Sequence, residues 1–169
     1  PKTFRNTELI YDNDLAEVVE KMGYKTILTE GAKHILGWRS PNYVYMPKST
    51  KKLKLLLKNF PLSDDIAFKF THEDRELTAT AYASWLKQIA GNGETINLFM
   101  DYETFGEHQW EETGIFEFLE HLPNEVLANK DFCFNTPDEV CDKYQAMSKI
   151  DVPYAVSWAD VEKDLSAWK

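Results

Sequence analysis

The chain has 169 residues, of which 43% are hydrophobic and 28% are charged, and this composition excludes a disordered or collagen-like protein. A formal net charge of -9 makes nucleic acid an unfavourable partner. No apolar run approaches the ~20 residues of a membrane-spanning helix, so we expect a soluble, cytoplasmic protein without membrane contact.

The first half of the chain alternates helical and strand patterns. Apolar residues at helical spacing predict a helix over residues 14–22, which Gly23 ends. A short strand is expected over 24–28, whereas the Leu-rich residues 53–57 fit either a helix or a strand. A further strand is expected over 66–70.

The second half continues this alternation. An apolar face predicts a helix over residues 78–89, and a continuous apolar strand is expected over 96–100. The remaining expected elements are helices over 111–120, 124–129 and 137–146 and a brief strand over 132–134.

Strands that alternate with helices and read as apolar runs predict an α/β fold with mostly parallel strands, covered on both faces. The sequence has no internal repeat and no Gly/Ser-rich linker, so we expect residues 1–169 to form a single unit. Such sheets carry their chemistry where strands end at the carboxyl edge. This rule selects the turn at residues 29–31, the loop after Phe70 that contains His72, and the segment after Met100.

The segment after Met100 carries the clearest chemical signal. Asp101 and Glu103 lie two residues apart at the end of an expected strand, so one carboxylate can face a substrate while the other orients a neighbour. His108 and Trp110 add a hydrogen-bonding ring and a stacking face. The same pattern also fits an acidic helix N-terminus with a capping Asp.

A second carboxylate, Glu8, lies between apolar residues near the N-terminus. Taken alone, a Glu in this context is more often an exposed strand residue than a nucleophile. The two segments together, FRNTEL at 4–9 and MDYETFGEH at 100–108, resemble the nucleophile and acid/base segments of glycoside hydrolase family 57, particularly its α-amylase-like members. The stretch SWADVEKDLSAW at 157–168 resembles the approach to the last conserved segment of that family.

This resemblance implies a retaining glycoside hydrolase that acts on α-1,4-glucans such as starch, glycogen or maltodextrin, or a 4-α-glucanotransferase. It implies Glu8 as the nucleophile and Asp101 as the general acid/base, with no cofactor and no metal. The fold implied is part of an incomplete (β/α)7 barrel. Each carboxylate would then lie at the end of its own strand.

The family's first conserved segment, His-Gln-Pro, is absent, and the chain begins with Pro1. We therefore expect the chain to be a fragment from the later part of the catalytic domain, inactive or weakly active alone. A piece that lacks the early strands leaves an unpaired sheet edge, which predicts self-association through that edge.

Glucan binding requires aromatic rings for the sugar faces and polar groups for the hydroxyls. The candidates are Trp38 and Tyr45, with Glu103, His108 and Trp110 beside Asp101. Trp38 and Tyr45 fit core packing equally well.

Two other functions compete with the glycosidase. A carbohydrate deacetylase on a related barrel would need a metal held by His and Asp, but His34, His72 and His121 lack metal-ligand spacing. A non-catalytic glycan-binding domain would keep the fold without turnover, although the presence of both Glu8 and Asp101 argues against it.

Overall fold

A computed structural model describes residues 1–71, 77–159 and 161–166 of the chain. These residues divide into two compact units, each built from separate stretches of sequence. Unit 1 comprises Pro1–Phe60, Gly93–Asn97 and Asn135–Lys169, and unit 2 comprises Pro61–Asn92 and Leu98–Phe134. The single unit expected from the sequence stays a prediction.

Unit 1 is an α/β structure whose main sheet has the strand order β1-β2-β4, all parallel. Its elements are β1 (Thr3–Arg5), η1 (Thr7–Leu9), α1 (Asn13–Lys21), β2 (Thr26–Thr29), α2 (Lys33–Leu36), β3 (Met46–Pro47), β4 (Lys54–Leu57), α6 (Pro137–Lys143) and β5 (Lys149–Ile150). A second, two-stranded parallel pair joins β3 to β5.

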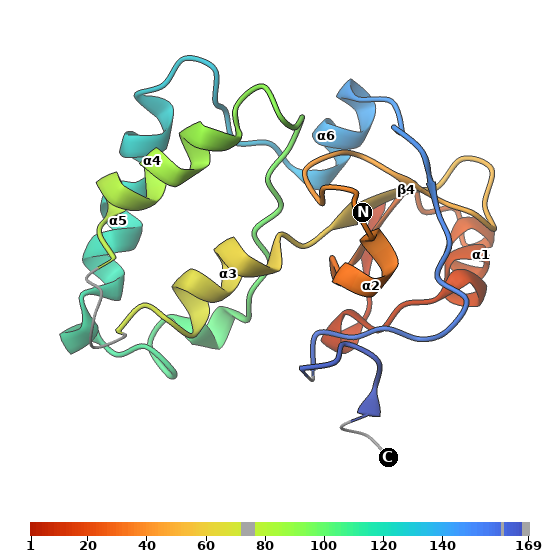
Figure 1. Ribbon diagram of the computed structural model, residues 1–169, viewed down its shortest axis with the longest axis horizontal. Coiled ribbons are helices and arrows are strands. Elements are labelled where there is room, and N and C mark those ends of the chain that lie inside the picture. Colours follow the sequence, from red (N-terminus) through yellow and green to blue (C-terminus); the bar gives the residue numbers. More distant parts are fainter. Residues whose placement is uncertain (72–76, 160, 167–169) are drawn as a thin grey trace. The chain divides into compact units, whose positions relative to one another are not determined.

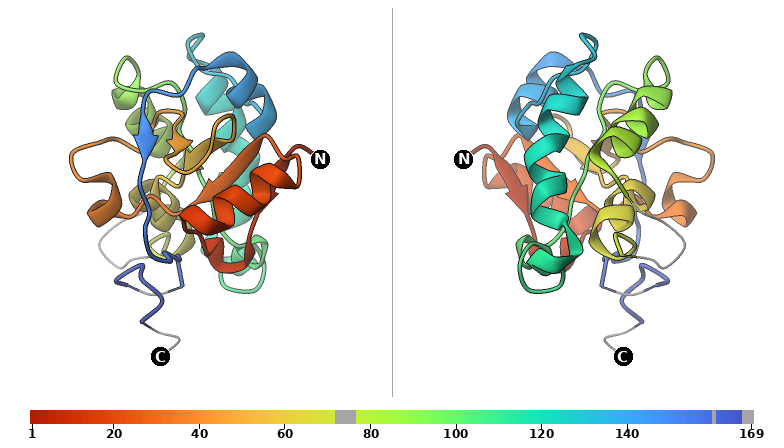
Figure 2. Two further views of the ribbon diagram at one scale, coloured as in Figure 1. Left: turned by 90° about the vertical axis from the view of Figure 1, so that its right-hand side faces the viewer. Right: turned by 90° about the vertical axis from the view of Figure 1, so that its left-hand side faces the viewer.

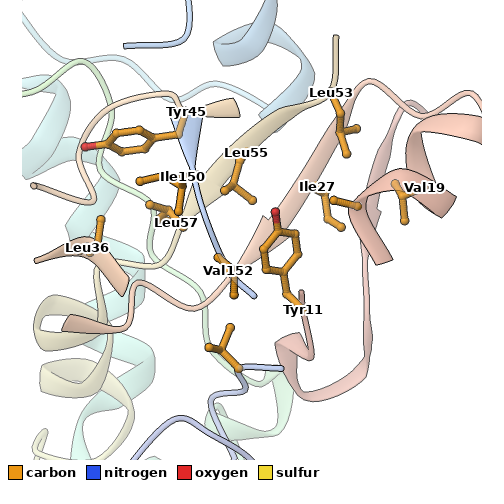
Figure 3. Close-up of a cluster of buried hydrophobic side chains, with 12 residues drawn as sticks. Tyr11, Val19, Ile27, Leu36, Tyr45, Leu53, Leu55, Leu57, Ile150 and Val152 are labelled. Atoms are coloured by element: carbon orange, nitrogen blue, oxygen red, sulfur yellow. The ribbon is translucent and has the colours of Figure 1, made fainter. Parts of the chain in front are cut away.

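Helices α1 and α6 cover opposite faces of the main sheet (Figure 2). Ile27 of β2 is paired with Leu55 of β4, and both belong to the buried cluster that includes Val19 of α1 (Figure 3). Thr26 and Lys54 point the other way because side chains alternate along a strand. Lys54 donates to the Tyr144 carbonyl at the end of α6, 2.6 Å away, so both faces are covered as predicted.

The ends of these helices follow from their sequences. Asp12 caps α1 by accepting a hydrogen bond from Leu15 N at 2.8 Å. Thr136 and Glu139 form a reciprocal capping box at the start of α6. The ambiguous run at 53–57 is a strand, β4, because its alternate residues fill the buried cluster on one face.

Unit 2 is helical. Its elements are α3 (Phe60–Ala67), which starts at the last residue of unit 1, α4 (Ala79–Ile89), η2 (Tyr102–Thr104), η3 (Glu111–Thr113) and α5 (Ile115–Leu127). Helix α4 packs against α5 (Figure 1), and the rings of Tyr82 and Phe118 meet edge to face with centroids 5.8 Å apart. The Tyr82 hydroxyl donates to the Leu62 carbonyl at 2.8 Å, which ties α4 to α3.

The strand expected over 66–70 is wrong. Ser63, Ile66 and Ala67 are the buried residues of α3, and this i, i+3, i+4 spacing is helical. The strand expected over 96–100 is also wrong, because this segment has no strand pairing. Instead, the side-chain amide of Asn97 donates to the Leu57 carbonyl at 2.9 Å, and its backbone carbonyl accepts from Asn59 N at 2.8 Å. A single asparagine thus binds the backbone at the end of β4 in place of a paired strand.

The expected strand over 132–134 is irregular, since Phe132 N and Asp131 N both bind Asn129 in a turn after α5. The two helices expected over 111–120 and 124–129 form a short η3 followed by one continuous helix, α5. Helix α5 starts after Gly114, whose φ is 79°. Across the described part of the chain, every helix is too short or too polar to cross a lipid bilayer.

Candidate active site

The three parallel strands of unit 1 bring charged residues to one edge of the sheet. Strand β1 leads into the turn that holds Glu8, β2 is followed by Glu30, and β4 is followed by Lys58. Parallel strands end at the same edge, which is where sheets of this class bind ligands. The edge therefore combines two carboxylates with a lysine.

Glu8 occupies a strained backbone position. Its φ of 50° lies in the left-handed region, as does the φ of 51° at the buried Leu9. This region costs a residue with a side chain about 1–2 kcal/mol. The cost is offset by donors to the Glu8 carbonyl, namely Ser157 Oγ at 2.8 Å and Trp158 N at 3.1 Å. Strain that is held in this way is typical of functional sites.

The Glu8 carboxylate is held by a tryptophan. Trp158 Nε1 donates to Glu8 Oε2 at 2.8 Å. The same indole ring lies 4.8 Å from the Arg5 guanidinium carbon and 5.0 Å from Lys58 Nζ. Both distances are within the range of a cation–π interaction.

Glu30 anchors the other side of this edge, and its carboxylate is buried. Lys58 Nζ and Lys163 Nζ each lie 3.8 Å from Glu30 Oε2, and Gly31 N donates to Oε1 at 2.7 Å. The turn at 29–31 was expected at the carboxyl edge because it follows a strand, but no chemical role was expected for Glu30. Its position at a strand end was the signal that could have found it.

In unit 2, Asp101 begins a compact loop over residues 101–110. Asp101 is the N-cap of η2 but its side chain makes no capping bond, so the capping alternative finds no support. The buried Thr104 and Gln109 anchor the loop, since Gln109 N donates to the Thr104 carbonyl and Gln109 Nε2 donates to the Ala67 carbonyl. Gly106, at φ 109, allows the tight turn.

The polar and aromatic residues of this loop face solvent. His108 Nε2 lies 3.7 Å from Glu103 Oε1, and both side chains are more than half exposed. The Trp110 ring is 64% exposed while its Nε1 donates to the Glu107 carbonyl at 2.7 Å. Tyr102, for which no role was expected, is 94% exposed. The loop thus presents Asp101 next to exposed aromatic faces.

The two aromatic candidates in unit 1 differ. Trp38 is 93% exposed directly after α2, and the Arg39 guanidinium carbon lies 5.9 Å from the centroid of its ring. Most of this ring is therefore accessible to a ligand. Tyr45 is 1% exposed and belongs to the core, with its hydroxyl donating to the Ser40 carbonyl at 2.6 Å (Figure 3). The expectation of a sugar-stacking Tyr45 is corrected to its packing alternative, since the ring has no exposed face.

The histidines within the described ranges make separate contacts. His34 stacks on Tyr154 with ring centroids 5.9 Å apart, and His121 lies 4.0 Å from Glu117 on α5. His72 lies outside the described residues. Among residues 1–71, 77–159 and 161–166, no group of three or more His, Cys, Asp or Glu could hold a metal ion.

Comparison with known proteins identifies the family. The sequence model of Glycosyl hydrolase family 57 matches residues 1–153. The chain belongs to this family. A curated relative from Methanocaldococcus jannaschii, named "Putative alpha-amylase", is 50% identical over 172 residues. The match covers 99% of this chain and 36% of that relative, so the chain spans about a third of the relative's length.

A solved structure shows the same fold. The crystal structure of 4-alpha-glucanotransferase from Thermococcus litoralis matches with a TM-score of 0.70 and 16% identity, over 92% of this chain and 24% of that one. The expected class, α/β with parallel strands as part of a larger incomplete (β/α)7 barrel, is confirmed by this likeness. The family 57 chain carries Glu8, Trp38 and Glu30 in unit 1, and Asp101 with its loop in unit 2.

Proposed function

We propose that the protein carrying this family 57 chain is a retaining glycoside hydrolase that acts on α-1,4-glucans. The observation that carries the proposal is the Glu8 carboxylate, held in a strained turn at a strand end by the Trp158 indole. Family membership and the relative's name support an α-glucan as substrate. The exposed acidic residue of the MDYETF segment, Asp101, supplies the second carboxyl group.

In the proposed reaction, Glu8 attacks the anomeric carbon while the glycosidic C–O bond breaks and Asp101 gives its proton to the leaving oxygen. A covalent glycosyl ester on Glu8 results. Asp101, now ionised, takes a proton from water, and the resulting attack on the same carbon releases the sugar and regenerates both carboxyl groups. A retaining mechanism requires these carboxyl groups to lie about 5–5.5 Å apart in the complete protein.

Exposed side chains of both units would bind the glucan. Trp38 and Trp110 offer open rings for the apolar faces of glucose units. Glu103 and His108 would bind sugar hydroxyls beside Asp101. Transfer to a second glucan in place of water would give a glucanotransferase, the activity named for the structural neighbour.

The test compares the full-length protein with its Glu8→Gln and Asp101→Asn variants on maltooligosaccharides, with Glu120→Gln as an exposed-carboxylate control. We expect the first product to keep the α configuration by NMR. The Glu8 variant should lose at least about a thousandfold in rate. Added azide should give an α-glycosyl azide with the Asp101 variant and the β anomer with the Glu8 variant. Release of acetate from acetylated sugars, or binding without turnover, would contradict the proposal.

A further inference from the structure

The segment that follows Val156 supplies the side-chain contacts of Glu8. Tyr11 and Val156 exchange backbone hydrogen bonds of 3.0 and 2.9 Å, which fixes this segment beside the turn that holds Glu8. Ser157 and Trp158 then bind the Glu8 carbonyl, and Trp158 Nε1 binds Oε2. Within the described part of the chain, no other side chain or amide donates to this carboxylate.

We propose that Trp158 is a positioning residue for Glu8: its indole N–H holds Oε2 and leaves Oε1 to form the bond to the anomeric carbon. This inference rests on the proposed function, since it takes Glu8 as the nucleophile. One oxygen of a carboxylate can attack while the other keeps its hydrogen bond, and the fixed bond sets the direction of the free oxygen. A nucleophile placed in this way needs little reorganisation on reaching the transition state.

Trp158 is itself held by a ring of contacts with Lys163, Glu30 and Lys58, called the buried circuit below. Lys163 Nζ donates to the Trp158 carbonyl at 3.1 Å and lies 3.8 Å from Glu30. Glu30 lies 3.8 Å from Lys58, and Lys58 lies 5.0 Å from the Trp158 ring. Glu30 and Lys58 are almost fully buried, so this circuit has little freedom. The indole is thereby fixed at both its backbone and its ring.

Arg5 and Lys58 also strengthen the Trp158 indole N–H as a hydrogen-bond donor. A cation near an indole ring withdraws electron density and makes its N–H a better donor. Their positive charge further stabilises the carboxylate anion that departs when the glycosyl ester is cleaved. Loss of the N–H bond should therefore slow turnover more than it weakens substrate binding.

The experiment uses the full-length protein and a fluorinated glucosyl fluoride that accumulates the covalent intermediate. The variants are Trp158→Phe, which removes the N–H, and Trp158→His, which keeps a ring N–H donor. Trp85→Phe is the matched control because that ring packs on Tyr82 in unit 2. The exposed Arg5 gives the variant Arg5→Gln, which removes one cation from the ring without disturbing the buried circuit.

We expect Trp158→Phe to lower kcat about tenfold to a hundredfold, with KM changed less than about threefold. Trp158→His should recover part of the lost kcat, since it keeps a ring N–H donor. If wild-type protein is labelled at Glu8 but Trp158→Phe keeps the wild-type kcat, the positioning inference fails. Label on another residue in the wild-type protein would overturn the proposed function instead.

Melting curves of each variant test whether it folds. If Trp158→Phe does not fold, Arg5→Gln decides the question. A lowered kcat at a nearly unchanged KM, absent from Trp85→Phe, supports the inference, and an unchanged kcat overturns it.

Discussion

The turn that starts β4 depends on the charge of Glu20, the last carboxylate of α1. Glu20 Oε1 accepts hydrogen bonds from the backbone N–H groups of Lys51, Lys52 and Leu53, at 3.0, 2.6 and 3.0 Å. Burial acts to raise the pKa of Glu20, but these donors and the charge of Lys51 outweigh it and lower the pKa below its ordinary value of 4.5.

The Glu20→Gln substitution keeps one acceptor oxygen and removes the charge. A hydrogen bond to a charged group contributes about 1.5–3 kcal/mol. Any of the backbone amides of residues 51–53 that lose this partner can bind water at this partly exposed site. We therefore expect a loss of about 1–2 kcal/mol in the free energy of unfolding at neutral pH. Because the folded-state pKa is lowered, this stabilisation is fully present above the unfolded-state pKa and disappears as the pH falls through the folded-state pKa.

The assay is urea unfolding of the purified protein and of Glu20→Gln at pH 7 and in steps down to about pH 3. Glu17→Gln is the control, since Glu17 lies on the same helix and its carboxylate forms an exposed ion pair with Lys21 at 3.8 Å. The difference between wild type and Glu20→Gln should shrink towards acid pH, while the control stays within about 0.5 kcal/mol of wild type. A difference that is the same at pH 7 and pH 3 would refute this reasoning.

Two further substitutions test the supports of each unit. In Gly31→Ala, the added Cβ would lie 2.2 Å from the Lys58 carbonyl oxygen, so we expect the free energy of unfolding in urea to fall by about 2–4 kcal/mol. The control Gly91→Ala, where the Cβ meets open space at φ +86, should lower it by about 1 kcal/mol. Equal losses would argue against close approach at Gly31. In Tyr82→Phe, the hydrogen bond from the Tyr82 hydroxyl to the Leu62 carbonyl is lost, and we expect the free energy of unfolding to fall by about 1 kcal/mol. An unchanged unfolding midpoint would show that this bond contributes no net stability.

The sequence allowed prediction of the features that depend on local pattern. The helices expected over 14–22, 78–89 and 137–146 follow from the spacing of neighbouring residues, and the structure has α1, α4 and α6 in these ranges. The parallel sheet also followed from the alternation of elements. The apolar run at 96–100 predicted a strand that does not form, because the side-chain amide of Asn97 binds the Leu57 carbonyl in place of strand pairing.

The candidate site was predicted only in part. Two motifs pointed to Glu8 and Asp101, but neither periodicity nor spacing can show that Trp158 binds Glu8, a contact across 150 residues of sequence. The same holds for Glu30, whose buried pairing with Lys58 depends on strand register. Tyr45 illustrates the opposite error, because an aromatic residue in a loop segment fits a ligand surface and a core equally well until its burial is known.

The central claim is that Glu8 forms the covalent bond to the sugar. The most direct measurement is mass spectrometry of the full-length protein after reaction with the fluorinated glucosyl fluoride, followed by peptide sequencing. A mass increase of one fluoroglucosyl unit on Glu8, absent from the Glu8→Gln variant, is the predicted result. A label on any other residue, or turnover of glucan that survives the Glu8→Gln substitution unchanged, would contradict the account.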